Sequence, residues 1–318
     1  METIRIPNLA TESPIALSDV IVAAPLASRL FLGVSPVGRA LQTAAIGWYA
    51  SSAVVDWIER KGIRKIDFLA EYGADVSHLD AMTAEERLEE IDILTRRLAE
   101  GLTTEERPRE TVARDVDHHL TGYIASVTNQ RIETSTQVRS FGLASLMMPF
   151  AVGACDVLSG DVAIYRKMGL LEPHLIAHEF VHRKGYWWEL HAQALSYFAL
   201  IGSGDPLLVQ SARLERLHRQ LKVVARDGIT EETSGDIYSE RLAELDLPEE
   251  IKKTLDSLKP PASTVQSGFS RAMKMVYDER MKLTGQNGIS DYDEGFTNFL
   301  HTFGRSDSAR QPRDLAAA

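Results

Sequence analysis

Hydrophobic and polar positions alternate with a helical period over most of the chain. Thr83 and Glu86 form a capping-box signature, and the apolar residues from Leu88 to Leu98 follow it at helical spacing. A second helical pattern covers Thr103–Asn129, with a proline near its first turn. Further helices are predicted over Pro173–Lys184, Trp187–Ile201, Leu207–Arg226, Ile237–Leu245, Pro248–Leu258, Gly268–Leu283 and Tyr292–Phe303.

The segment Ser140–Tyr165 has a different pattern, with several glycines and short apolar runs. It predicts loops and one or two short strands, for example over Asp161–Tyr165. Pro260-Pro261 marks a break between two of the later helices. The chain is therefore expected to be a predominantly helical α+β protein, with a short strand region before the helix at Pro173.

Two apolar stretches precede these elements. Ile15–Val34 contains two charged residues and a proline, whereas Ala40–Val55 is uncharged but rich in small side chains. A membrane-spanning helix needs about 20 strongly apolar residues, which neither stretch supplies cleanly. We expect a helical hairpin here, and the sequence leaves two places for it: buried against the rest of the chain, or associated with a membrane through residues 15–55.

The composition limits the classes of function. The chain has 318 residues and a formal net charge of −10, and residues 71–110 carry twelve acids and five bases, so most of the negative charge lies in one helical region. Proteins bind nucleic acid through clustered Lys and Arg, so no nucleic acid partner is expected for so acidic a chain. Cys155 is the one cysteine of the sequence, which excludes an intramolecular disulfide and is typical of a reducing, cytoplasmic location.

Histidines are concentrated in one short stretch. Four of the nine lie within the 18 residues from His174 to His191. Inside this stretch, His178, Glu179 and His182 form an H-E-x-x-H motif on a predicted helix, with a proline just before that helix and a glycine just after it. The motif is typical of zinc-dependent hydrolases, so this stretch is the first candidate for the functional site.

The spacing of the motif places its side chains for metal chemistry. His178 and His182 are four residues apart and share a helix face, so both imidazoles can reach one Zn²⁺ at about 2.0–2.1 Å. Glu179 lies about 100° around the helix from His178, beside the metal. A general base must occupy such a place to take a proton from a metal-bound water.

A catalytic zinc usually has three protein ligands, and two residues compete for the third place. Glu189 follows His182 by seven residues, across a glycine that can turn the chain. His191 is the alternative; on the next helix it points about 200° away from Glu189, so the two are not expected to bind one ion. Gln193, one turn after Glu189, is placed to orient one of the histidines from outside the ligand set.

These residues resemble the zincin metallopeptidases, and more closely a bacterial family of zincin-like proteins whose function is unassigned. The family pattern is H-E-x-x-H-x-x-G, then E-x-E-A-N, then an apolar helix. The corresponding residues here are His178–Gly185 and Glu189–Gln193, and Met148–Phe150 and Val276–Asp278 are also similar. The resemblance spans residues 140–303 and is strong over residues 172–206.

The resemblance implies a zincin-like fold, zinc-dependent peptidase activity, and Glu189 as the third ligand, as in gluzincin-type sites. His191 replaces the second acid of the family pattern and Gln193 replaces its asparagine, so the choice of ligand stays open. The family typically has membrane helices before its catalytic part, which favours a membrane contact for the N-terminal stretches. We divide the chain into an N-terminal helical hairpin (1–60), an acidic helical region (61–139), a zincin-like catalytic region (140–304) and a disordered tail (305–318).

Several residues near the motif are weaker candidates. His174 lies one turn before His178, where it either lines the cleft or simply packs. Tyr186 and Tyr197 either donate to an oxyanion or lie half-buried in the core. The pair Trp187-Trp188 forms a substrate wall or, as we prefer, fastens two helices together.

Three more features lie farther from the motif. Gly160–Tyr165 precedes the motif helix, where zincin-like folds have an edge strand that pairs with the substrate backbone. His118-His119, with Asp115 and Asp117 nearby, suggests a second metal site, but adjacent histidines face different ways on a helix and a solvated surface is favoured. Cys155 has no base beside it and is expected to be a small packing or loop residue.

The main hypothesis is a zinc metallopeptidase with one Zn²⁺ held by His178, His182 and Glu189. Glu179 would take a proton from the metal-activated water and deliver it to the leaving amine of a peptide or protein substrate. The alternative is a metal-stabilised binding or regulatory module on the same fold that has lost turnover. Glu179 favours the enzyme, because a purely structural metal site has no use for a general base.

Overall fold

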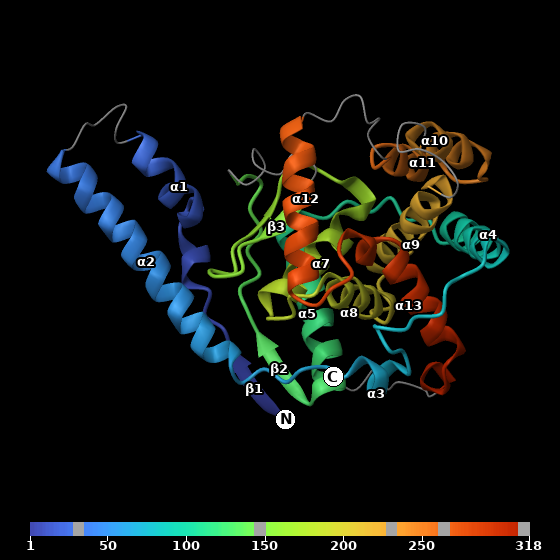
Figure 1. Cartoon of the computed structure of the whole chain (residues 1–318), viewed down its shortest axis with the longest axis horizontal. Helices are drawn as coiled ribbons and strands as arrows, with labels where there is room; N and C mark the ends of the chain where they lie inside the picture. The colour runs from blue at the N-terminus through green and yellow to red at the C-terminus, as the bar shows by residue number, and fades with distance from the viewer. Residues whose placement is uncertain (28–34, 143–150, 227–233, 260–267, 311–318) are drawn as a thin grey trace.

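The computed structural model describes residues 1–27, 35–142, 151–226, 234–259 and 268–310, which are predominantly helical (Figure 1). The α-helices are α1 Leu17–Ala27, α2 Pro36–Arg60, α3 Phe68–Tyr72, α4 Ala84–Glu100, α5 Arg109–Thr128, α7 Glu172–Arg183, α8 Glu189–Ile201, α9 Pro206–Arg226, α10 Ser234–Glu244, α11 Glu249–Asp256, α12 Gly268–Leu283 and α13 Glu294–Arg305. The short 3₁₀ helices are η1 Leu9–Glu12, η3 Gly169–Leu171, η5 Ile289–Tyr292 and η6 Asp307–Arg310. The strands are β1 Glu2–Arg5, β2 Gln130–Glu133, β3 Gly153–Cys155 and β4 Val162–Ile164.

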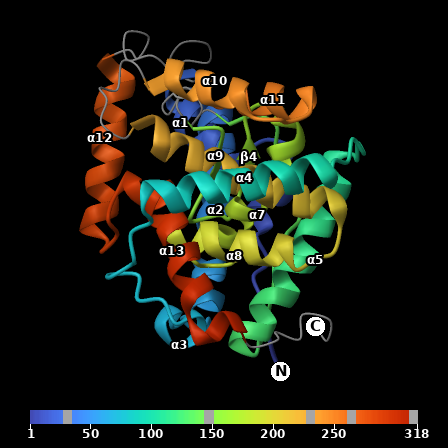
Figure 2. The same ribbon diagram turned by 90° about the vertical axis from the view of Figure 1, so that its right-hand side faces the viewer.

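The centre of the body consists of α5, α7, α8 and α9, which pack against one another. The helix α7 carries the H-E-x-x-H motif and is buried on all sides from Pro173 to Arg183. Helices α4 and α13 pack on α9, and α10 and α11 cover one end of it (Figure 2). The predicted helices of this region agree with the structure to within a few residues, because each presents an apolar face with the period of an α-helix.

The helix α4 confirms its predicted start, but its buried face includes a charged residue. The reciprocal capping box is present, since Thr83 Oγ1 accepts from the backbone N–H of Glu86 and the Glu86 carboxylate accepts from that of Thr83. Leu88 belongs to the apolar series at helical spacing, yet it is 49% exposed. Arg87 takes the inward place instead and donates to buried polar side chains of α9 and α13.

The helix predicted over Thr103–Asn129 begins six residues later, at Arg109. Pro108 is its N-cap residue, with extended ψ of 141°. The residue before a proline is pushed out of the helical region, so the segment before Pro108 stays extended. Thr103 is held there by the Gln210 side chain, which accepts from its backbone N–H at 2.7 Å.

The strands form two small sheets. The parallel pair β1–β2, in which Ile4 lies opposite Ile132, was not expected from the sequence. The predicted strand at Asp161–Tyr165 is present as β4, and it pairs antiparallel with β3. Arg139 bridges the other side of β4, so the edge strand of this sheet is β3 and not, as expected, the segment Gly160–Tyr165.

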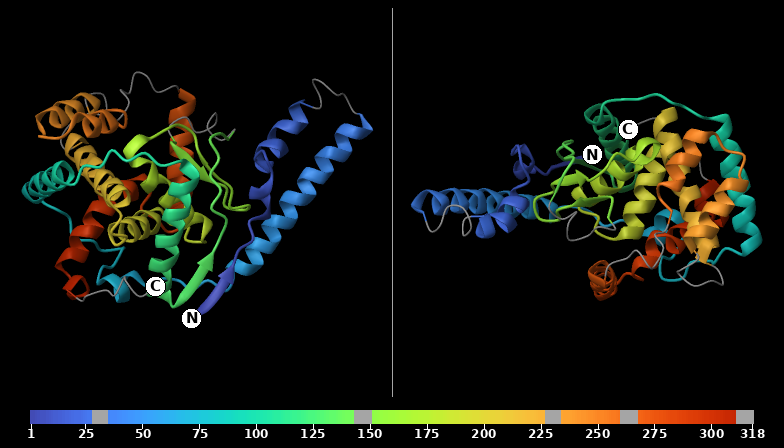
Figure 3. Two further views of the ribbon diagram at one scale, coloured as in Figure 1. Left: turned by 180° about the vertical axis from the view of Figure 1, so that it is seen from behind. Right: turned by 90° about the horizontal axis from the view of Figure 1, so that it is seen from above.

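The helices α1 and α2 form the predicted N-terminal hairpin, which stands away from the body like an arm (Figures 1 and 3). The buried residues of α2 are Gly38, Ser52 and Asp56. Its large apolar side chains are exposed, namely Val37, Leu41, Ile46, Trp48, Val54, Trp57 and Ile58. Of the two places that the sequence left open for the hairpin, burial against the rest of the chain is therefore wrong for α2. The helix face that meets the body carries Ser52 and Asp56, and the large apolar side chains lie on the other faces.

Hydropathy adds one further fact about this arm. Within the residues that the structure describes, no helix is both long enough and apolar enough to cross a membrane.

The last part of the chain has more structure than its polar sequence indicates. The helix α13 extends to Arg305, and η6 follows it. Ser306 Oγ donates to the carbonyl oxygen of Tyr72 at 2.9 Å, which fastens this end to α3. The predicted disordered tail therefore does not include residues 305–310. Residues 311–318, Met148–Phe150 and Pro260-Pro261 lie outside the described residues.

Candidate metal centre

The turn between α7 and α8 brings the predicted ligands together. Gly185 ends α7 with a φ of +99°, and a Cβ there would lie only 2.7 Å from Ile63, so this turn requires glycine. The chain then reverses, and α8 begins at Glu189. His178, His182 and Glu189 form a buried group whose ligand atoms all lie within 4.8 Å of one another, the one such group among the described residues.

The spacing of these atoms fits a metal ion. The Oε2 atom of Glu189 lies 3.1 Å from Nε2 of His178 and 3.4 Å from Nε2 of His182. Ligands of a tetrahedral zinc ion at 2.0–2.1 Å are separated by about 3.3–3.4 Å. Two imidazoles and one carboxylate are also a donor set that zinc accepts, so the chemistry and the geometry both fit one ion.

The protein fixes the tautomer of one ligand. The Nδ1 atom of His182 lies 2.9 Å from the backbone carbonyl oxygen of Tyr186. A carbonyl oxygen only accepts, so Nδ1 carries a hydrogen and Nε2 is directed at the group. The Nδ1 atom of His178 is buried and has no hydrogen-bond partner in the described part of the chain. The imidazole of His182 is thus held by a hydrogen bond at Nδ1, whereas His178 contacts Glu189 through Nε2 and has no such bond at Nδ1.

The charges of the candidate ligands shift one another's pKa values. Burial disfavours the ionised form of Glu189, but the neighbouring His182 and His178 outweigh it and hold the pKa of Glu189 well below its usual value. Burial also disfavours a charged His182, yet Glu189, Glu179 and the Tyr186 carbonyl together raise the pKa of His182 to about 9. A metal ion and the His182 proton would therefore compete for one place beside the carboxylate.

Glu179 lies next to the group without belonging to it. Its side chain is 8% exposed, and burial, the largest influence, raises the pKa of its carboxyl group. Its Oε1 atom faces β3, where a Cβ on Gly153 would lie 3.4 Å from that oxygen and 2.7 Å from Ile164. A side chain at this position would thus meet Ile164 first and would also touch the carboxylate. A carboxyl group whose pKa is raised toward neutrality suits general-base chemistry.

Arg183 connects the motif helix to the strand region. Its buried guanidinium donates to the carbonyl oxygens of Gly160, Ser135 and Gln137 at 2.6–2.7 Å. These carbonyls belong to the segment after β2 and to the turn before β4. The contacts fix the distance between α7 and the β3–β4 sheet, and so the place of Glu179 relative to the edge strand.

Two tyrosines at the group had no role in the sequence-based prediction. Tyr277, on α12, donates its hydroxyl hydrogen to Oε1 of Glu189 at 2.7 Å. The hydroxyl of Tyr292, in η5, lies 3.1 Å from that of Tyr277, and its ring stacks 5.9 Å from His178. Burial raises the pKa of Tyr277, so that its hydroxyl remains a donor. Val276–Asp278 was the one signal in the sequence that pointed to this segment.

His174 and Gln193 pair with each other under the site. The Nε2 atom of His174 lies 3.1 Å from Oε1 of Gln193, and the Gln193 amide donates on to Glu215. Gln193 was expected to orient a metal ligand, but the histidine that it contacts lies outside the group. Burial lowers the pKa of His174 to about 4, so this imidazole is neutral and serves packing and hydrogen bonding.

The rival ligand His191 faces away from the group. It stacks on Phe68 of α3 with ring centroids 4.0 Å apart, and burial lowers its pKa to about 4. Trp188 packs on its other side at 4.9 Å. Trp187 stacks at 6.4 Å from His182 and lies under the Arg60 guanidinium of α2. Trp187 thus joins this turn to α2 and borders a candidate ligand, whereas Trp188 packs on a residue of the helix that it caps.

The remaining candidates near the motif have other partners. The Tyr186 hydroxyl donates to the carbonyl of Arg64, and the Tyr197 hydroxyl accepts from Arg216, so neither is directed at the group. Burial raises the pKa of the Cys155 thiol, which leaves it a poor nucleophile.

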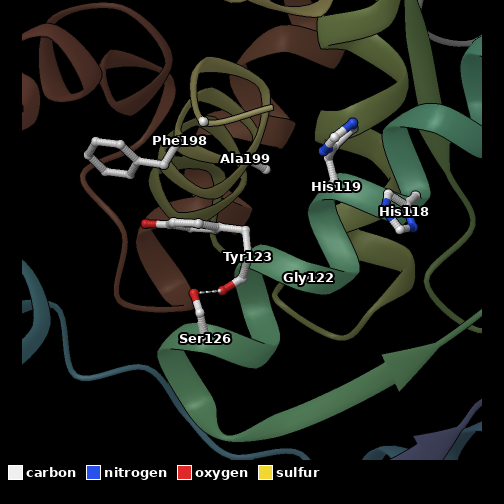
Figure 4. Close-up of a pocket in the computed structure, with 8 residues that line it drawn as sticks. His118, His119, Gly122, Tyr123, Ser126, Phe198 and Ala199 are labelled. Atoms are coloured by element: carbon white, nitrogen blue, oxygen red, sulfur yellow. Dashed lines mark hydrogen bonds between the residues drawn. The ribbon is translucent and has the colours of Figure 1, made fainter. Parts of the chain in front are cut away.

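The second histidine pair does not make a metal site. Figure 4 shows His118 and His119 on α5, beside a small hollow that Tyr123 and Phe198 also line. Of the acids nearby, Asp115 pairs with Arg107 and Asp117 with Lys184. The carboxylates are thus committed to cations, in agreement with the expected surface role for this pair.

Comparisons of the chain with protein-family models, with curated proteins and with solved structures gave no match.

Proposed function

We propose that the chain is a zinc-dependent metallopeptidase of the zincin type. The observation that carries the proposal is a buried group of three ligand atoms, all within 4.8 Å of one another, beside a buried glutamate. His178, His182 and Glu189 would hold the ion, and Glu179 would act as the general base. A structural zinc site would use four protein ligands and has no need of Glu179.

Each residue has a defined task in this proposal. When bound, the zinc ion would lower the pKa of a water molecule and polarise the carbonyl group under attack. Glu179 would accept the proton of that water and return it to the leaving amine. Its raised pKa suits both transfers, because the carboxylate must gain and lose a proton near neutral pH.

The sheet beside Glu179 offers a place for a peptide substrate. In the described residues, β3 pairs with β4 on one side and contacts the motif helix α7. An extended peptide can add to the edge of such a strand through backbone hydrogen bonds, without regard to its side chains. The substrate bond would then pass Gly153, where the Glu179 carboxylate approaches the strand.

The deciding experiment measures metal and cleavage in the full-length chain. Wild type should retain about one zinc per chain and cut members of a peptide library. Glu179→Gln should keep the zinc and lose at least 100-fold in cleavage rate, the contribution typical of a general base. Glu89→Gln, the same change on the exposed face of α4, is the matched control and should cleave like wild type.

The two functional hypotheses give different results in this experiment. A chain that holds zinc but cuts no peptide would be the metal-stabilised binding or regulatory module. A Glu179→Gln variant with wild-type cleavage would remove Glu179 from the mechanism, and a wild type without zinc would overturn the proposal as a whole.

We also propose that the α1–α2 arm contacts a membrane surface. The exposure of Trp48 and Trp57 on a helix that is uncharged from Ala40 to Val55 favours this contact. Flotation of the full-length chain with phospholipid vesicles tests it. A chain that stays wholly unbound would contradict the proposal.

A further inference from the structure

The segment from α12 to η5 reaches the candidate metal centre from almost ninety residues downstream of Glu189. Helix α12 lies on the outside of the body, and the turn after it leads to η5 and α13 (Figures 1 and 2). Its contacts with Glu189 are of two kinds, one to the side chain and one to the backbone.

The side-chain contact divides the two oxygens of the carboxylate. Tyr277 donates to Oε1, while Oε2 faces the two imidazoles at 3.1 and 3.4 Å. A Tyr hydroxyl has one hydrogen, and Tyr277 gives it to Glu189, so Tyr292 is the donor between the two tyrosines. Tyr292 also contacts the Glu189 carboxylate directly, so both hydroxyl groups gather on this side chain.

The backbone contact holds the start of α8. Trp188 is the N-cap residue of that helix and makes no side-chain capping bond. Gln286, in the turn after α12, supplies the missing acceptor: its Oε1 atom accepts from the N–H of Glu189 at 2.8 Å. That turn is itself fixed, since Asp278 accepts from the N–H of Ile289 at 2.7 Å.

We infer that Tyr277 is a positioning residue for the third metal ligand. Its hydrogen bond occupies one carboxylate oxygen of Glu189 and directs the other toward His178 and His182, so that the centre is complete only when α12 is docked. The inference rests on the proposed function, because it assigns Glu189 to the metal. Partners that orient a ligand in this way commonly contribute 10–100-fold to metal affinity.

Zinc affinity of the full-length chain, measured in competition with a chromogenic chelator, tests this inference. Tyr277→Phe removes only the hydroxyl group and should weaken zinc binding about 10–100-fold. Glu189→Ala is the reference for loss of the ligand and should weaken it further. Tyr238→Phe is the matched control: it removes a buried hydroxyl that bonds His218 and the Leu255 carbonyl, away from the group, and should leave zinc affinity unchanged.

Thermal unfolding of the zinc-free variants separates positioning from stability. Similar midpoints for Tyr277→Phe and Tyr238→Phe, with a loss of zinc affinity only in the former, would support the inference. Zinc affinity of Tyr277→Phe within about two-fold of wild type would overturn it and leave the metal site standing, as would an equal loss in Tyr238→Phe. A wild-type chain that binds no zinc would overturn both this inference and the proposed function.

Discussion

The motif helix α7 and the arm helix α2 distribute their side chains in opposite ways. In α7, charged and polar residues are buried, among them His178, Glu179 and Arg183. In α2, the buried residues include Ser52 and Asp56, while the large apolar side chains face outward. One helix places polar groups in the centre of the body, and the other exposes apolar groups far from it.

The difference between the two helices depends on whether buried polar side chains find hydrogen-bond or ion-pair partners. Buried polar groups are tolerated only when they are hydrogen-bonded or paired, and the body supplies such partners from several elements at once. The arm meets the body mainly through polar contacts, such as Asp56 with the backbone and side chain of Asn8 at 3.0 and 2.8 Å. The polar centre of the body is therefore expected to carry stability, and the arm to carry little.

The largest expected effect follows from removing a buried cation of the body. Arg183→Met would leave three carbonyl oxygens without their donor, and the free energy of unfolding should fall by about 4 kcal/mol. Arg97→Met, on the exposed face of α4, is the control and should change it by less than about 0.5 kcal/mol. Urea denaturation measures both. If Arg183→Met lowers the free energy of unfolding no more than Arg97→Met does, the buried polar contacts of the body do not carry its stability.

A somewhat smaller effect is expected from pH. Burial opposes ionisation of Glu215, but Arg219, His174 and His218 outweigh it and lower the pKa of Glu215 from 4.5 to about 2. A lowered pKa in the folded state means that the carboxylate stabilises the fold above pH 4.5, and that this contribution disappears as pH falls toward 2. The loss should amount to about 3 kcal/mol.

Denaturation between pH 6 and pH 3 checks this dependence. Glu215→Gln should be destabilised at pH 6 and should show a flatter profile below pH 4.5. Glu89→Gln, on exposed α4, should keep the wild-type profile. If the wild-type and Glu215→Gln profiles run parallel, the charge network beneath the site does not contribute as described.

The smallest expected effect on stability concerns the arm. The double change Trp48→Ser and Trp57→Ser removes side chains that are 46% and 59% exposed, and should alter the free energy of unfolding by less than about 0.5 kcal/mol for each. The same variant should bind phospholipid vesicles more weakly than wild type. Destabilisation of several kcal/mol would instead show that the arm is part of the folding core.

Local signals in the sequence predicted much of the fold. The capping box at Thr83 and the glycine at 185 fix where helices begin and end, because their effects involve only neighbouring backbone groups. The strands β1 and β2 were missed, since four-residue strands that pair across more than 120 residues leave little trace in either segment. The inward place of Arg87 was not predicted, because periodicity does not reveal that it finds polar partners inside.

In the candidate site, too, some features follow from local sequence and others do not. The i, i+4 spacing put His178 and His182 on one face, and this follows from helix geometry alone. The choice of Glu189 over His191 was left open by the sequence. In the structure, His191 stacks on Phe68, whereas Glu189 meets both imidazoles.

The sequence by itself determined the motif helix, its flanking turn and the candidate ligands, because those depend on residues within one or two helical turns of each other. Only the tertiary structure decided that Tyr277 meets Glu189, that Gly153 brings a strand to Glu179, and that the arm stands outside the body. Each of these joins segments far apart in the chain. Such contacts depend on how all the elements pack together, and no local pattern encodes them.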